Sequence, residues 1–230
     1  DMFNPKKILA QISNAKNLLL TPEKFEHYSK GFIQETVVKI YREYEKILKV
    51  NNAVDFDDLI MRTVQLFENN PDILEHYQDQ FKFILIDEYQ DTNHAQYKFA
   101  SLLAQKHQNI CVVGDDAQSI YSFRGADIQN ILNFERDYPQ AKIIKLEQNY
   151  RSTKKILAAS NEIIALNRNQ KRKTMWTKND DGNNIIVYEA MDEKDEASWI
   201  GKKILSLQNT GVSLNDITLL YRTHAQSRSL

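Results

Sequence analysis

Apolar side chains in the first 80 residues recur at intervals of three and four, the spacing that places them on one face of an α-helix. One stripe runs from Ile8 to Leu19, and a longer one runs from Ile33 to Leu48. Signals for helix starts, either a capping side chain or a first-turn proline, occur at Asn4-Pro5, Thr21-Pro22, Asp55 and Pro71. We therefore expect an all-helical segment at the start of the sequence.

The pattern changes at residue 81, where short unbroken apolar runs begin to alternate with helical stripes. Unbroken runs are typical of strands that are buried on both faces of a parallel sheet. They occupy residues 81–86, 110–113, 143–146, 185–188 and 217–221. Stripes that predict helices separate them, at about 95–103, 127–137, 156–166 and 193–207. Strands that alternate with helices predict βαβ units, so we expect an α/β fold with partial parallel sheets flanked by helices.

The composition is typical of a folded soluble protein and excludes several other classes. Of the 230 residues, 42% are hydrophobic and 27% are charged, with a net charge of −1, which argues against disorder and low complexity. Six glycines and four prolines fall below the roughly 16 and 12 of average usage, which favours long helices. The single cysteine, Cys111, excludes a disulfide framework. No membrane-spanning stretch and no signal-peptide pattern occur, so we expect a cytoplasmic protein with no membrane partner.

Basic residues are concentrated in one later part of the sequence. Between Arg151 and Lys178 there are eight basic residues and a single acid, Glu162. Such a cluster can attract a polyanion. Solvated helix faces and a loop would give the same composition, so both interpretations stay open at this point.

Two acids follow the first apolar run. Asp87 and Glu88 come directly after Ile84-Leu85-Ile86, which is the Walker B pattern. The carboxyl ends of parallel strands are where α/β sheets bind ligands. There one carboxylate can hold Mg²⁺ against nucleotide phosphates, and its neighbour can position or deprotonate a water. The alternative is an exposed acidic turn, because so short a motif recurs by chance.

The next two apolar runs are also followed by polar side chains. Gln118 lies just past the second run, where its amide could contact a γ-phosphate or an attacking water; the alternative is a turn residue that binds backbone. Arg151 follows the third run and supplies a guanidinium for phosphate contact and transition-state charge, and the alternative is a salt bridge. Tyr150 beside it offers a ring that could stack on a base.

A short segment between these positions carries two aromatic residues and a cation. Tyr121, Phe123 and Arg124 suit stacking on unpaired bases and pairing with phosphate. The alternative is that the two rings only fill a core.

Two kinds of site are missing from the sequence. A Walker A loop needs the pattern G-x-x-x-x-G-K-[ST], and none of the six glycines builds it. The nearest match ends in Gly201-Lys202, with Glu196 at the first glycine position and Lys203 at the hydroxyl position. The five histidines show no metal-ligand spacing, and one cysteine cannot make a zinc site.

Three of these segments together resemble superfamily 1 DNA helicases of the UvrD/PcrA/Rep type. Residues 87–91, 114–126 and 146–152 are similar to motifs II, III and IV of that family, in the same order and at suitable separations. Two further segments, 55–59 and 220–228, also resemble family segments, and the first 50 residues match more loosely.

The resemblance implies a particular domain organisation. Members of the family have two RecA-like domains with ATP in the cleft between them and a helical insertion in the first. By this similarity, residues 1–54 would form the helical insertion subdomain, residues 55–147 the C-terminal half of the first RecA-like domain, and residues 148–230 the N-terminal part of the second.

The resemblance also implies roles for the nucleotide-binding candidates. Asp87 would bind Mg²⁺, and Glu88 would be the base for the hydrolytic water. Gln118 would sense the γ-phosphate of ATP and couple it to DNA. Tyr150 would stack on the adenine, and Arg151 would serve as an arginine finger from the second domain.

For DNA, the resemblance implies that Tyr121 and Phe123 stack on bases with Arg124 beside the strand. The family more often has tryptophan at Phe123 and a basic residue at Ser122. Phenylalanine can still stack, so this departure bears on the strength of DNA contact rather than on its existence.

We therefore expect a piece of an ATP-dependent 3′–5′ DNA helicase that moves on single-stranded DNA and separates duplex DNA. We expect the piece alone to be inactive, because it lacks a Walker A loop and the family's last two motifs. The alternatives are a RecB/AddA-type helicase–nuclease and a degenerate, non-catalytic module that binds DNA or docks a partner. The exposed edge of a partial sheet also predicts artificial self-association.

Overall fold

The computed structural model describes residues 4–168 and 170–229 and divides into two compact units. Unit 1 comprises the chain up to residue 147 together with residues 161–175, and unit 2 comprises residues 148–160 and 176–230. Within the described part of the chain, no helix is both long enough and apolar enough to cross a membrane.

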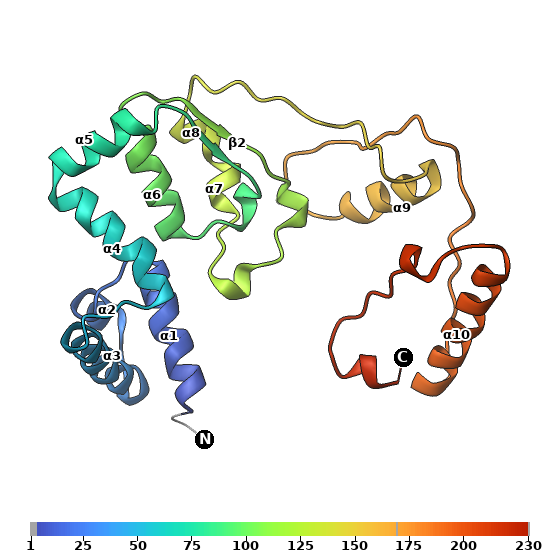
Figure 1. The fold of residues 1–230 in the computed structure, drawn as a ribbon, viewed down its shortest axis with the longest axis horizontal. Helices are drawn as coiled ribbons and strands as arrows, with labels where there is room; N and C mark the ends of the chain where they lie inside the picture. The colour runs from blue at the N-terminus through green and yellow to red at the C-terminus, as the bar shows by residue number, and fades with distance from the viewer. Residues whose placement is uncertain (1–3, 169, 230) are drawn as a thin grey trace. The chain divides into compact units, whose positions relative to one another are not determined.

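Unit 1 begins with three helices that enclose a small core. They are α1 (Pro5–Asn17), α2 (Pro22–Tyr28) and α3 (Phe32–Val50), drawn in blue in Figure 1. The side chains of Asn4 and Thr21 cap α1 and α2 as the sequence predicts. The buried cluster between the helices consists of Ile8, Ile12, Ala15, Val37 and Tyr41.

Three further helices form a second layer that leads toward the sheet. They are α4 (Phe56–Asn69), α5 (Pro71–Gln80) and α6 (His94–Ala104). A capping box between Asp55 and Asp58 starts α4. The ring of Phe67 on α4 stacks on that of Phe99 on α6, with centroids 6.0 Å apart. This contact fixes α4 against the helix that follows the first strand.

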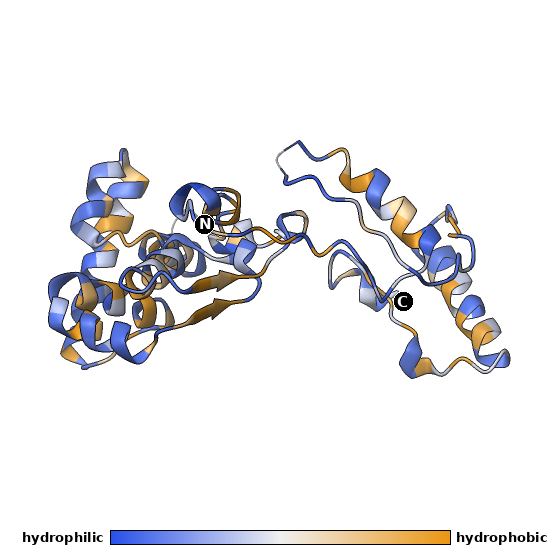
Figure 2. Ribbon diagram, turned by 90° about the horizontal axis from the view of Figure 1, so that it is seen from above, coloured by the Kyte–Doolittle hydropathy of each residue, from blue (hydrophilic) through white to orange (hydrophobic). Residues whose placement is uncertain are grey.

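The sheet consists of two parallel strands, β1 (Ile84–Ile86) and β2 (Ile110–Val112). Their register pairs Ile84 with Ile110 and Ile86 with Val112, and both strands are hydrophobic in Figure 2. The connection between them contains α6, so this part is a βαβ unit, as the sequence predicts. Short helical turns follow each strand: η1 (Tyr89–Asp91) after β1, and η2 (Asp116–Gln118), η3 (Ser122–Arg124), α7 (Gln129–Leu132) and α8 (Phe134–Asp137) after β2.

Unit 2 is built mainly around one long helix. The last turn of α9 (Lys154–Ile164) lies in unit 1, and its earlier residues lie in unit 2. The long helix is α10 (Glu193–Asn209), which begins where the Asp192 side chain accepts hydrogen bonds from the backbone N–H groups of Lys194 and Asp195. The ring of Tyr188 stacks on Trp199 with centroids 4.8 Å apart. Two short turns, η4 (Leu214–Asp216) and η5 (Gln226–Arg228), follow.

The structure corrects four of the predicted elements. The apolar runs 143–146, 185–188 and 217–221 form no strand, and Ile144 and Leu146 are largely exposed. A strand exists only with a partner, and among the described residues these runs have no ladder to join. The helix expected at 127–137 is two short helices, because the backbone leaves the helical region at Asn133.

Candidate functional site

The carboxyl ends of β1 and β2 lie side by side, which brings the segments after them together. The backbone N–H of Val113 donates to the carbonyl of Ile86 at 2.8 Å, and the N–H of Tyr89 donates to the carbonyl of Val113 at 3.0 Å. The buried ring of Tyr89 meets that of Phe134 edge to face, with centroids 5.7 Å apart. These contacts anchor residues 87–91 against residues 113–118.

Asp87 and Glu88 are both exposed at this junction. The Asp87 carboxylate accepts a hydrogen bond from the backbone N–H of Glu88 at 2.9 Å. Glu88 has φ 50° and ψ 41°, a left-handed conformation that costs a non-glycine residue about 1–3 kcal/mol. Strain of this kind gathers at functional sites, where the surrounding structure enforces it.

Gln90 connects the two segments through its side chain. It is only 1% exposed, and its Nε2 donates to Glu88 Oε2 at 2.8 Å. Its Oε1 accepts a hydrogen bond from the backbone N–H of Asp115 at 3.0 Å. Gly114 leaves room for this contact, because a Cβ there would lie 2.6 Å from Gln90 Oε1. A larger residue at position 114 would therefore displace the amide.

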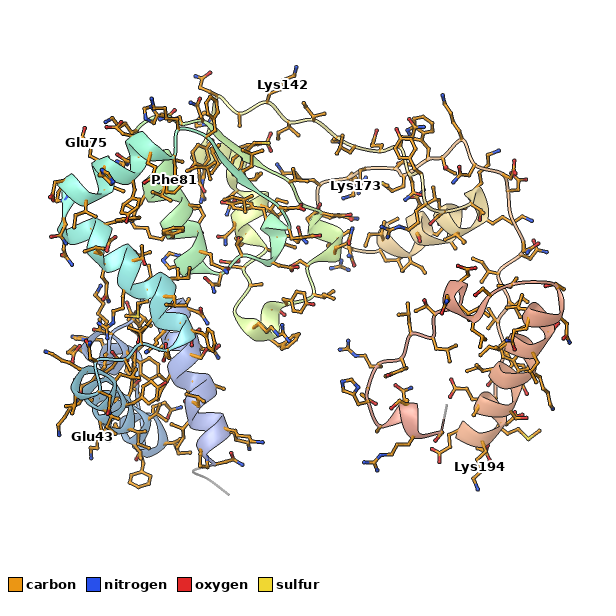
Figure 3. The ribbon with its side chains drawn as sticks, viewed as in Figure 1. Glu43, Glu75, Phe81, Lys142, Lys173 and Lys194 are labelled. Carbon is orange, nitrogen blue, oxygen red and sulfur yellow. The ribbon has the colours of Figure 1, made fainter. Side chains whose placement is uncertain are left out.

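The Asp115 carboxylate is the centre of a second set of contacts. It accepts hydrogen bonds from Gln118 Nε2 at 2.9 Å and from the backbone N–H of Ala117 at 3.0 Å. It also pairs with Lys173, which is labelled in Figure 3. Burial, the largest effect, would raise the pKa of Asp115, but the hydrogen bonds from Lys173 and Gln118 outweigh it and hold that pKa below its usual value.

The acids of this region compensate part of the basic cluster seen in the sequence. Besides the Lys173–Asp115 pair, Lys171 forms an ion pair with Glu135, and its backbone N–H donates to Asp116 Oδ2 at 2.8 Å. These two lysines therefore form ion pairs with acids of unit 1. Such pairing agrees with the interpretation of the basic cluster as an ordinary protein surface.

The aromatic segment lies on the surface of unit 1. The rings of Tyr121 and Phe123 are 5.9 Å apart, and Phe123 is 73% exposed. The Arg124 guanidinium lies over both rings, 5.1 Å and 5.5 Å from their centroids. Gly125 ends the turn with φ +85°, a conformation that glycine adopts without strain. Flat rings and a cation are therefore presented to solvent instead of filling a core.

Tyr150 and Arg151 lie in unit 2, whereas the other candidates lie in unit 1. Tyr150 is 79% exposed, and Arg151 is also exposed. Their turn is held by Asn149, whose Oδ1 accepts hydrogen bonds from the backbone N–H groups of Arg151 at 2.9 Å and Ser152 at 2.7 Å. The backbone N–H of Asn149 in turn donates to the carbonyl of Trp176 at 2.7 Å.

The donor set suits a metal ion only if another molecule supplies most of the ligands. Among the described residues, no group of three or more His, Cys, Asp or Glu side chains could hold a metal ion. Mg²⁺ commonly takes one or two carboxylates together with phosphate oxygens and water. The exposed Asp87 carboxylate fits that arrangement, in which a nucleotide completes the coordination.

Two residues at the centre of these contacts had no assigned role from the sequence, Gln90 and Lys173. Gln90 lies in the segment 87–91, where only Asp87 and Glu88 were candidate site residues, and its partner Asp115 is 25 positions away. Lys173 is one of several lysines in a basic stretch, and its partner is 58 positions away. The one local signal was Gly114, a glycine directly after an apolar run.

A family model described as the UvrD/REP helicase N-terminal domain matches residues 1–139, and one described as the UvrD-like helicase C-terminal domain matches residues 144–230. The chain is 53% identical over 228 residues to the ATP-dependent DNA helicase PcrA of Staphylococcus epidermidis. The aligned region comprises 99% of this chain and 31% of that protein. It is 52% identical over 227 residues to PcrA of Bacillus subtilis, and that aligned region comprises 98% of this chain and 31% of that protein. The chain thus spans about a third of the length of these curated relatives.

Proposed function

Because the chain belongs to the UvrD/REP helicase family, we propose that it acts as part of an ATP-dependent 3′–5′ DNA helicase. The whole enzyme would couple ATP hydrolysis to movement on single-stranded DNA and to duplex unwinding. The observation that carries the proposal is the junction after β1 and β2, where Glu88 and Gln118 are linked through Gln90 and Asp115. A binding module has no need for such a junction, because it hydrolyses nothing.

The proposal includes a domain organisation. Residues 1–54 are the helical insertion subdomain, residues 55–147 the C-terminal half of the first RecA-like domain, and residues 148–230 the N-terminal part of the second. The boundary at 54 falls directly before the capping box that starts α4. It separates the group of helices α1–α3 from the group that begins with α4.

The nucleotide-binding roles are those that the similarity to the helicase family implies, and the chemistry of each side chain suits its role. Asp87 holds Mg²⁺, which when bound offsets charge on the phosphates. Glu88, exposed beside it, accepts a proton from the hydrolytic water. Gln118 senses the γ-phosphate through its amide. Tyr150 stacks on the adenine, and the Arg151 guanidinium stabilises transition-state charge from the second domain.

The DNA-binding roles fall on the exposed turn η3. Tyr121 and Phe123 offer their faces to unpaired bases, and base–aromatic stacking is worth about 1–3 kcal/mol per base. Arg124 lies over both rings and would pair with a phosphate of a strand whose bases stack there. Gln118 and the rings are only a few residues apart in the chain, which supports coupling between nucleotide and DNA.

The chain alone is expected not to hydrolyse ATP, because its sequence holds no Walker A loop to wrap the phosphates. Purified chain should therefore show no ATP hydrolysis, with or without single-stranded DNA. A DNA-stimulated signal that the Glu88→Gln substitution abolishes would contradict this expectation.

A chimeric enzyme tests the proposed function directly. The 230-residue chain would replace the matching segment of Bacillus subtilis PcrA, to which it is 52% identical. We expect the chimera to unwind a duplex with a 3′ single-stranded tail and to leave one with a 5′ tail paired. A folded chimera that binds ATP but separates neither substrate would contradict the proposal.

A further inference from the structure

The buried side chain of Gln90 is not explained by the roles given above. Glutamine is mostly found at protein surfaces, yet Gln90 is only 1% exposed. Burying an amide is costly unless its hydrogen bonds are satisfied, and both ends of this amide have partners.

The chemistry of the two partners fixes the orientation of the amide. The Glu88 carboxylate can only accept a hydrogen bond, so the Gln90 NH₂ group must face it. The backbone N–H of Asp115 can only donate, so the Gln90 oxygen must face that N–H. Rotating the amide by 180° would break both contacts. Gln90 therefore holds Glu88 and Asp115 in one defined relation.

The contact extends to the candidate phosphate sensor. Gln118 Nε2 donates to Asp115 Oδ2 at 2.9 Å, the Asp115 N–H donates to Gln90 Oε1 at 3.0 Å, and Gln90 Nε2 donates to Glu88 Oε2 at 2.8 Å. Four residues are thus joined from the sensor amide to the carboxylate proposed as the base. If Gln118 releases Asp115 to contact a phosphate, the change reaches Glu88 through a single side chain.

Another buried glutamine in unit 1 shows what a purely structural role looks like. Gln78 on α5 is 7% exposed, and its Nε2 donates to the carbonyl of Leu102 at 2.7 Å. That bond ties α5 to α6 and involves none of the candidate site residues. Gln78 therefore provides a matched control for the loss of a buried amide.

We propose that Gln90 is a positioning residue that orients Glu88 for proton transfer and transmits the state of the Gln118 segment to it. This inference rests on the proposed ATPase function. A misplaced base lowers the rate of the chemical step while leaving nucleotide binding intact, and displacement by about 1 Å can cost about 100-fold. Gln90 touches neither ATP nor water in this scheme and acts only through Glu88.

The first test compares Gln90→Met with Gln78→Met in the PcrA chimera. Both substitutions keep the side-chain length and remove a buried amide. For Gln90→Met we expect the kcat of DNA-stimulated ATP hydrolysis to fall about tenfold or more, with the KM for ATP within about twofold of the parent. For Gln78→Met we expect kcat to stay unchanged. Equal kcat values for the two variants would overturn the inference while leaving the proposed function intact.

The second test uses the chain itself and does not depend on ATP hydrolysis. Hydrogen exchange at the backbone amide of Asp115 should accelerate about tenfold or more in Gln90→Met and stay unchanged in Gln78→Met. Unchanged exchange in Gln90→Met would overturn the inference even if the chimera proved inactive. A chimera without DNA-stimulated hydrolysis, combined with accelerated exchange, would reject the proposed function, and with it the part of the inference that concerns proton transfer.

Discussion

Burying a lysine is costly unless its charge is compensated, and Lys16 near the end of α1 shows how this chain does so. Its side chain has 0% exposure, and its Nζ lies 2.7 Å from a Glu45 oxygen, 2.8 Å from Asp55 and 3.0 Å from Asp58. Burial, the largest effect, would lower the pKa of Lys16, but the hydrogen bonds that its ammonium donates to Asp55, Glu45 and Asp58 outweigh it and raise that pKa. One cation thus joins α1 to α3 and to the start of α4.

Replacing Lys16 with methionine should destabilise the chain strongly, because three carboxylates would lose their shared counter-ion. Removing one partner of a buried ion pair typically costs about 3–5 kcal/mol. Urea unfolding followed by circular dichroism measures this free energy. Lys46→Met, at an exposed pair with Glu43, is the control and should change it by less than about 1 kcal/mol. Similar losses for both variants would show that the Lys16 cluster does not hold these helices together.

The same cluster predicts how stability depends on acid. Burial would raise the pKa of Asp55, but the hydrogen bonds from Lys16, the Asp58 backbone and Tyr44 outweigh it and lower that pKa. A lowered folded-state pKa means that its contribution is fully present above the unfolded value of about 3.9 and is lost as the pH falls through the folded pKa. Asp55→Asn keeps a good capping side chain but removes the charge. The stability gap between parent and variant should therefore be wide at pH 6 and should narrow as the pH falls below the unfolded value of about 3.9. A gap independent of pH would contradict this.

Residues with local roles were predictable from the sequence, and residues with distant partners were not. Asn4, Thr21 and Asp55 cap helices through atoms two or three positions away, so their signals lie within a short stretch of sequence. Gln90 meets Asp115 because β1 and β2 pair, and Lys173 meets it because residues 161–175 fold back onto unit 1. Nothing near either residue in the sequence identifies that partner.

At the scale of elements, the same distinction separates helices from strands. A helix satisfies its hydrogen bonds within its own segment, and α1, α3, α4, α6 and α10 all lie close to their predicted positions. The parallel pairing of β1 and β2 was also predicted correctly, because a helix connects them. The run 143–146 has the same apolar character but no adjacent strand among the described residues. The apolar pattern alone therefore predicted a strand that does not form.

The packing of α4 on α6 depends on Phe67, which is 3% exposed between Phe99 and Tyr77. Truncating it to alanine leaves a cavity where α4 meets α5 and α6. Phe67→Ala should lower the free energy of unfolding by about 3–5 kcal/mol. Phe56→Ala, at a ring that is 91% exposed on the same helix, should change it by less than about 0.5 kcal/mol. Equal effects in urea unfolding would contradict this packing.

At the scale of the molecule, one face of the sheet carries exposed apolar side chains. The register pairs Leu85 with Cys111, and both are exposed, Leu85 to 78%. An exposed apolar strand is a site for association with another chain. Sedimentation velocity of the purified chain should therefore show an average mass that rises with concentration, and Leu85→Lys should reduce that rise. A strict monomer at high concentration for both proteins would contradict self-association.

We propose that the junction after β1 and β2 is a centre for ATP hydrolysis that DNA controls. The most direct measurement is the rate of ATP hydrolysis by the PcrA chimera, with and without single-stranded DNA, in parent and Glu88→Gln forms. Removing a general base typically costs about 100-fold or more. Glu75→Gln, at an exposed residue on α5 that pairs with Lys106, serves as the control (Figure 3). We predict DNA-stimulated hydrolysis in the parent and in Glu75→Gln, and its loss in Glu88→Gln with ATP binding retained; equal hydrolysis by the parent and Glu88→Gln would contradict the claim.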